Sequence, residues 1–102
     1  MFTIKKGDTK KSLYAELSNQ KGPVDLTECK VYLRIGSLPL NNDGLCEIKD
    51  AAAGLVWYVF EQGETDQPGF YKGEFEVHYP DFRKETFPND GYIDINIKKD
   101  LR

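Results

Sequence analysis

The sequence predicts an all-β domain of the sandwich or barrel class, and three observations support this. Apolar and polar residues alternate along several short segments, which is typical of strands with one buried face. Clusters rich in Gly, Asn, Asp and Pro separate these segments at intervals of about 8 to 12 residues, as in sandwiches and barrels. No segment has a sustained helical period. The 102 residues are about one domain's length, so we expect a single domain over residues 1–102.

Four segments carry the alternation that defines a half-buried strand. The polar residues between the apolar ones predict one wet face for each strand, as in antiparallel sheets. The apolar faces are Leu13, Ala15 and Leu17; Val31, Leu33 and Ile35; Tyr71, Gly73, Phe75, Val77 and Tyr79; and Ile93, Ile95 and Ile97.

The segment LVWYVF, residues 55–60, differs because apolar residues occupy both of its faces. This pattern predicts a central strand that is covered on each side, or a strand whose outer face meets a partner. Trp57, the only tryptophan, lies in the middle of the segment. We expect Trp57 in the core between the two sheets.

Turn-forming residues mark the ends of several strands. Residues 7–9 (GDT) predict a turn after the first strand, and residues 25–27 (DLT) predict a turn that a side chain stabilises. Pro68 and Gly69 are expected to open a strand. Pro88 is expected to end one, because proline cannot donate a ladder hydrogen bond.

The charge distribution argues against two classes of partner. The formal net charge is −3, whereas a nucleic-acid-binding protein needs clustered Lys and Arg to replace the counterions on phosphate. Gly7 and Asp8 interrupt the one dense basic stretch, which we interpret as a solvated turn; its lysines are Lys5, Lys6, Lys10 and Lys11. Since the longest apolar run falls far below the ~20 residues that cross a bilayer, we expect no membrane insertion and no signal peptide.

The two cysteines, Cys29 and Cys46, match no zinc-binding spacing, and the single His78 cannot complete a metal site with them. Their parity with Val31 and Ile48 predicts that both thiols are buried and reduced. A disulfide between them is the alternative, which the sequence leaves open because it does not give their separation in space.

His78 follows Glu74 and Glu76 at two-residue spacing, so the three side chains share one face of a strand. Acid–base catalysis generally needs a pocket that shifts pKa values, and an exposed strand face lacks one. We therefore interpret these residues as a solvated face. Nucleophile elbows, phosphate loops and dinucleotide fingerprints find no match either. The sequence thus predicts no catalytic residue, no metal site, no cofactor and no enzyme activity.

Five stretches occur in a characteristic order between Phe2 and Ile97: FTIKKGDT, PVDLTECKVYLRI, GLVWYVF, PGFYKGEFEVHY and TFPNDGYIDINI. In this order and spacing the chain resembles the immunoglobulin-like N-terminal domain of phage baseplate upper proteins, found in tails of phages of Gram-positive bacteria. The resemblance implies an immunoglobulin-like antiparallel β-sandwich.

The resemblance also implies a function without catalysis. It implies a phage or prophage structural protein that docks onto other tail and baseplate proteins as part of a host-adhesion device. The implied location is the virion, at the tail tip or baseplate, after assembly in the bacterial cytoplasm, with a homo-oligomer in the virion as a further option. Longer family members continue into a helical, receptor-binding region, so a chain that stops at Arg102 is either a cut-out domain or a small tail component.

Three tyrosines face outward by parity and are the predicted partner-binding residues: Tyr14, Tyr32 and Tyr92. Tyrosine is enriched where interfaces concentrate their energy. Surface aromatics on a β-sandwich also stack on sugars, which makes a carbohydrate-binding module the alternative function. Parity does not say whether the three rings lie on one sheet.

Overall fold

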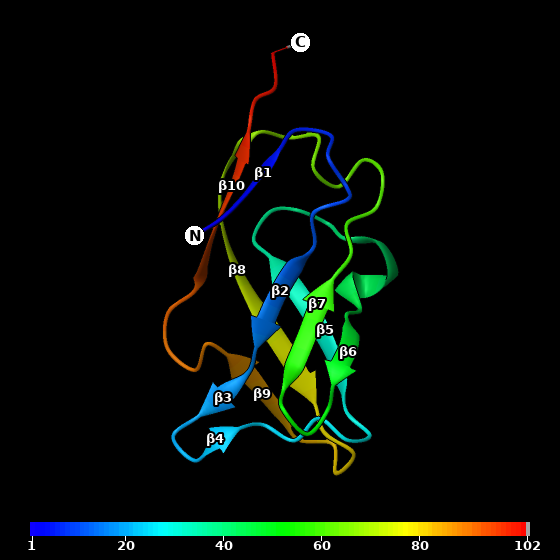
Figure 1. Cartoon of the computed structure of the whole chain (residues 1–102), viewed down its shortest axis with the longest axis vertical. Helices are drawn as coiled ribbons and strands as arrows, with labels where there is room; N and C mark the ends of the chain where they lie inside the picture. Colours follow the sequence, from blue (N-terminus) through cyan, green and yellow to red (C-terminus); the bar gives the residue numbers. More distant parts are fainter. Residues whose placement is uncertain (102) are drawn as a thin grey trace.

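The computed structural model describes residues 1–101, and its regular structure is almost entirely β (Figure 1). One short 3-10 turn, η1, is the exception among the described residues. The elements are β1 (Phe2–Lys5), β2 (Leu13–Glu16), β3 (Ser18–Asn19), β4 (Gly22–Pro23), β5 (Lys30–Ile35), η1 (Asn41–Gly44), β6 (Glu47–Asp50), β7 (Leu55–Tyr58), β8 (Gly69–His78), β9 (Lys84–Phe87) and β10 (Ile93–Lys98).

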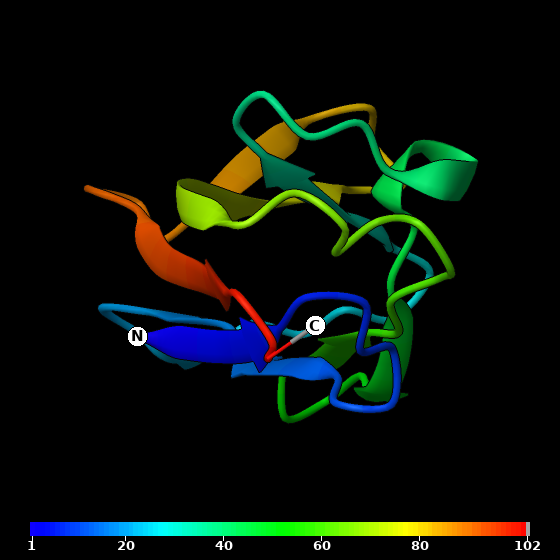
Figure 2. The same ribbon diagram turned by 90° about the horizontal axis from the view of Figure 1, so that it is seen from above.

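Two sheets pack face to face, which confirms the predicted all-β sandwich. The larger sheet has the order β1-β10-β8-β5, with β9 also paired to β8, and the smaller sheet has the order β2-β7-β6. Figure 2 shows the two layers from above, with β5 and β8 in one layer and β2, β7 and β6 in the other. The hairpin β3–β4 extends the chain beyond the end of β2.

One pair departs from the predicted antiparallel arrangement. Strand β1 runs parallel to β10, with Phe2 opposite Ile95 and Ile4 opposite Ile97. The first strand therefore belongs to the larger sheet and not to the sheet of β2, which follows it in sequence. This placement leaves β2 at an edge of the smaller sheet.

Strands β9 and β10 lie end to end along one side of β8. Phe87 pairs with Phe75 and Ile93 pairs with Gly73, so residues 88–92 loop out where a regular strand would place a single residue opposite Glu74. Pro88, whose peptide bond with Phe87 is cis, begins this excursion. Pro88 thus ends β9, as predicted.

The core lies between the sheets and contains the predicted inward faces. The larger sheet contributes Val31 and Phe75, both 0% exposed, and the smaller sheet contributes Val56, also 0% exposed. The longest strand, β8, runs through the middle of the larger sheet, which explains why its alternating pattern is so regular. Other buried members of this core are Leu13, Leu17, Leu33, Ile35, Tyr58, Val77, Ile95 and Ile97.

The expected position of Trp57 is wrong. In β7, Val56 and Tyr58 point into the core, and Leu55 and Trp57 are only partly buried on the opposite face. Successive side chains of a strand point to opposite faces, so Trp57 cannot lie in the core when its neighbours Val56 and Tyr58 do. Apolar side chains therefore occupy the outer face of β7, and the alternative that this face meets a partner stays a prediction.

The remaining local predictions agree with the structure. The carboxylate of Asp25 accepts hydrogen bonds from the Thr27 backbone N–H at 3.0 Å and from its hydroxyl at 2.6 Å, so a side chain does stabilise this turn. The N–H of Asp8 donates to the carbonyl of Lys5 and closes the turn after β1. Cys29 and Cys46 are both buried and unpaired with each other, which confirms the free thiols.

Candidate binding surface

The outer face of the smaller sheet carries a row of three side chains from its three strands. Tyr14 on β2 pairs with Trp57 on β7, which in turn pairs with Glu47 on β6. The rings of Tyr14 and Trp57 meet edge to face, with centroids 6.3 Å apart and planes at 78°. We call Tyr14, Trp57, Glu47 and the nearby Lys49 the aromatic face.

Polar groups hold the indole in place. The Nε1–H of Trp57 donates a hydrogen bond to the Glu47 carboxylate, and the Lys49 ammonium lies 4.1 Å from the Trp57 ring centroid. The register shift between Ile48 and Asp50 places Lys49 at a bulge beside the ring. An anion at the ring edge and a cation over the ring face match the indole quadrupole and its single donor.

The aromatic face is open to solvent. Tyr14 is 53% exposed, and Val59, which follows β7 with the same outward parity as Trp57, is 45% exposed. Clusters of exposed apolar side chains rimmed by charges mark interaction sites more often than isolated ones do. The cluster can contribute apolar area and stacking to a partner, together with one carboxylate and one ammonium.

The structure separates the three predicted tyrosines. Tyr14 lies on the aromatic face, whereas Tyr32 lies on the outer face of the larger sheet, partly buried against His78. Tyr92, 61% exposed, lies in the 88–92 excursion before β10. No single platform holds all three rings, and the neighbour of Tyr14 is Trp57.

The face that holds Glu74, Glu76 and His78 is a charged cluster on the larger sheet. Glu76 lies at its centre, with His78 Nε2 at 2.7 Å, Arg34 Nη2 at 3.4 Å and Lys84 Nζ at 3.7 Å from its carboxylate oxygens. The Tyr32 ring packs edge-on against His78 at 5.0 Å. The Glu76 side chain is 18% exposed, so this face is less solvated than its sequence pattern predicts.

The electrostatics of this cluster favour an ionised carboxylate. The hydrogen bond from His78, and then the charges of Arg34 and Lys84, lower the pKa of Glu76 below its ordinary value of 4.5, against the opposite effect of burial. A general acid near neutral pH needs its pKa raised. The cluster is therefore suited to joining β5, β8 and β9, and its arrangement does not resemble an acid–base pair.

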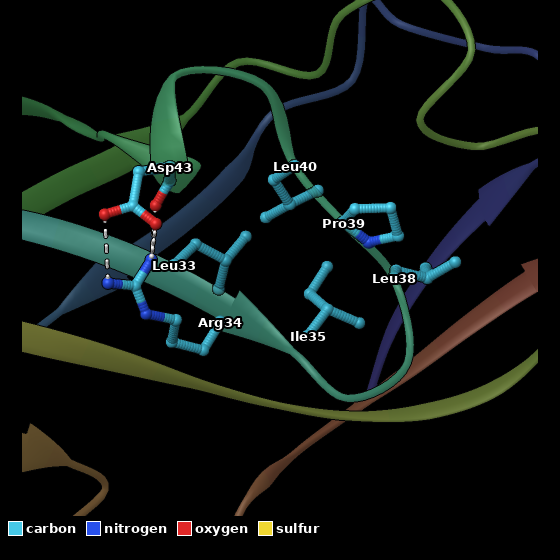
Figure 3. Close-up of a pocket in the computed structure, with 7 residues that line it drawn as sticks. All are labelled: Leu33, Arg34, Ile35, Leu38, Pro39, Leu40 and Asp43. Atoms are coloured by element: carbon cyan, nitrogen blue, oxygen red, sulfur yellow. Dashed lines mark hydrogen bonds and ion pairs between the residues drawn. The ribbon is translucent and has the colours of Figure 1, made fainter.

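A hollow lies beside the end of β5, under residues 38–43 (Figure 3). Arg34 Nη1 lies 3.0 Å from Asp43 Oδ1, and this ion pair closes one side of the hollow. The rest of its wall is apolar and consists of Leu33, Ile35, Leu38, Pro39 and Leu40. The guanidinium and the carboxylate satisfy each other, so the hollow presents no free reactive group.

Within residues 1–101, no cluster of three His, Cys, Asp or Glu side chains is arranged to hold a metal ion. No helix in this part of the chain is long and apolar enough to cross a membrane. The known protein families include none whose model matches this chain, and no curated protein or solved structure matches it either. The functional argument therefore rests on the surfaces themselves.

Sequence reasoning missed Trp57 and Glu47 as surface residues. For Trp57 the sequence held no signal of an outward position, because Leu55, Val56, Trp57 and Tyr58 are all apolar and only their burial in the structure alternates. What the sequence lacked was a polar residue in the outward positions of β7. Glu47 and Lys49 do alternate with Cys46 and Ile48, which assigns them outward once β6 is known to pair with β7.

Proposed function

We propose that this chain is a non-catalytic docking domain whose aromatic face binds another protein. One observation carries the proposal: Trp57 lies on an outer sheet face beside the exposed Tyr14. Trp, Tyr and Arg are the residue types most enriched at interface hot spots. Burying such a pair against a partner removes apolar area from water, and Glu47 and Lys49 supply a charged rim of both signs.

The resemblance of the ordered sequence stretches to phage baseplate domains supports one class of partner. On this proposal the domain is a phage or prophage tail or baseplate component of the host-adhesion device, located in the virion, and its partners are other tail proteins or further copies of itself. The all-β sandwich is consistent with this proposal and with many other binding functions.

The test is co-sedimentation of the purified domain with the tail proteins encoded in the same gene cluster. Trp57→Ala should weaken binding by about 2 kcal/mol or more if Trp57 is a hot spot, and Tyr14→Ala should also weaken it. Tyr92→Ala is the matched control, because Tyr92 is an exposed tyrosine away from the aromatic face. Wild-type protein that binds none of these tail proteins would overturn the proposal.

A carbohydrate-binding module is the second candidate, and the partly exposed position of Trp57 on an outer sheet face favours it. The exposed ring of Tyr14 offers a stacking surface for a sugar, and the Glu47 carboxylate and the Lys49 ammonium at the neighbouring indole offer hydrogen-bonding groups. A glycan array separates the two candidates. Binding to an oligosaccharide that Trp57→Ala abolishes, without any tail-protein partner, would support the module in place of the docking domain.

A further inference from the structure

The edge of β2 is unpaired along its length. In the described residues 1–101, β2 has β7 as its only partner strand. The Leu17 N–H donates to the Gly54 carbonyl at 2.8 Å, so residues 13, 15 and 17 form the hydrogen-bonded pairs with β7. It follows that the N–H and C=O groups of Tyr14 and Glu16 point away from β7 toward the free edge.

A groove opens beside this edge, with a volume of about 300 Å³. Ala15 and Leu17 line it on the β2 side, and Phe75, Phe87 and Ile93 line it on the side of the larger sheet. The groove lies where β9 ends and β10 has not yet begun. Leu17, Phe75 and Phe87 form its buried base, and the partly exposed Ala15, Pro88 and Ile93 form its accessible wall. Small Ala15 adds to this space.

The topology indicates what fits there. In a constant-type immunoglobulin sandwich the corresponding sheet has four strands, and its first strand lies beside the second. Here β1 pairs with β10 in the other sheet, so the smaller sheet has three strands and the position beside β2 has no strand of this chain in the described residues. The other edge of the sheet, β6, is protected by a bulge and by Lys49.

Charge supplies a second constraint. Glu16 is exposed on the outer face of β2, and among residues 1–101 no cation forms an ion pair with it. An incoming strand would place one side chain directly opposite Glu16, where a Lys or Arg is favoured, and alternate side chains would enter the apolar groove. The edge therefore favours an extended segment with free main-chain N–H and C=O groups. The groove favours apolar side chains at alternate positions of that segment, and Glu16 favours a basic side chain opposite it.

We infer that the β2 edge accepts an extended, basic and apolar-alternating segment of a partner protein as a fourth strand of the smaller sheet. The inference rests on the proposed docking function and names the kind of segment that docks. Main-chain hydrogen bonds to Tyr14 and Glu16 supply affinity, and side chains that enter the groove at Ala15, Pro88 and Ile93 supply specificity.

The experiment uses the whole domain and a pool of synthetic peptides in which Val alternates with Lys or Thr. The control pool has the same sequences with alternate backbone nitrogens methylated. We expect binding of the first pool alone, and protection of the Tyr14 and Glu16 amides from hydrogen exchange by about tenfold or more when peptide is added. Without peptide, these two amides should exchange much faster than those of Leu13 and Ala15.

Two variants separate the backbone from the side chain. Glu16→Pro removes the outward N–H without removing a hydrogen bond to β7, and it should weaken peptide binding by about tenfold. Glu16→Gln keeps the N–H and loses only the charge, so about two- to fivefold weakening is expected. If Glu16→Pro does not fold, protection of the Tyr14 amide in the wild-type domain decides the question.

Three results would overturn the inference. The first is a folded Glu16→Pro variant that binds the peptides as tightly as the wild type does. The second is a wild-type domain that binds no alternating peptide. The third is slow hydrogen exchange of the Tyr14 and Glu16 amides in the domain without peptide, whether another part of the chain or a second copy protects them. The docking function is tested separately: tail-protein binding that depends on Trp57 and not on the β2 edge would sink the edge inference and leave the docking function standing.

Discussion

The Tyr58 hydroxyl donates a 2.7 Å hydrogen bond to the buried carboxylate of Glu64. The same carboxylate also accepts bonds of 2.7 Å from the backbone N–H groups of Asn41 and Glu61. Glu64 is only 7% exposed, yet these three donors satisfy it. One side chain thus ties the end of β7 to the loop that follows it and to the start of η1.

Replacing Glu64 with Ala should lower the free energy of unfolding by about 2–5 kcal/mol, because it leaves two backbone N–H groups and the Tyr58 hydroxyl without an acceptor in a buried site. Urea denaturation measures this. Glu61→Ala is the matched control, since the Glu61 side chain in the same loop is exposed. Equal stability of the two variants would show that the Glu64 contacts contribute little.

Trp57 should report a partly exposed indole. We expect a red-shifted native emission that a neutral quencher reduces readily, and a cost of about 1 kcal/mol for Trp57→Ala, since the loss is that of a cross-strand surface pair. A core tryptophan would cost ~3–5 kcal/mol. Val56→Ala, one residue away and 0% exposed, provides the buried comparison and should be the more destabilising change.

The two thiols should resist modification in the folded state. Burial raises the pKa of Cys46 to about 12 and also raises the pKa of Cys29, so the reactive thiolate is scarce at neutral pH. A thiol reagent should label neither residue in native protein and both after denaturation without reductant. Rapid labelling of native protein, or a thiol that stays unlabelled after denaturation, would contradict the structure.

Acid should weaken the contribution of Glu76. Its folded-state pKa lies below 4.5, its ordinary value, so its ion pairs stabilise the fold above about pH 4.5 and are lost as the pH falls through the folded-state pKa. The stability difference between wild type and Glu76→Gln should therefore shrink on acidification. Glu74→Gln removes the same charge from the same strand face and serves as the comparison. A difference independent of pH would exclude this role for Glu76.

Gly54 should not tolerate a side chain. Its φ of +71° is left-handed, and a Cβ there would lie 2.4 Å from the Leu17 carbonyl oxygen and 3.0 Å from that of Val24. Gly63, with φ of +94° and nothing within 4 Å of a Cβ, is the matched control. Gly63→Ala should cost about 1–2 kcal/mol from backbone strain. Gly54→Ala should cost clearly more, which thermal unfolding of the two variants measures.

Local sequence determined the strands with alternating patterns. Val31, Leu33 and Ile35 all point inward in β5, because alternation along a strand is a property of neighbouring residues and needs no knowledge of the rest of the fold. The turn at Asp25 and the end of β9 at Pro88 were predictable for the same reason. The aromatic stretch at 55–60 was not assignable in this way, because both parities were apolar.

Pairing between distant segments decided the rest. Residues 14 and 57 are far apart in the chain, and only the register of β2 against β7 brings Tyr14 and Trp57 together on one outer face. The burial of Glu64 likewise depends on donors from two loops. The sequence by itself determined which residues of each regular strand face inward. The tertiary structure decided which strands adjoin, because strand pairing depends on the packing of the whole core and not on local periodicity.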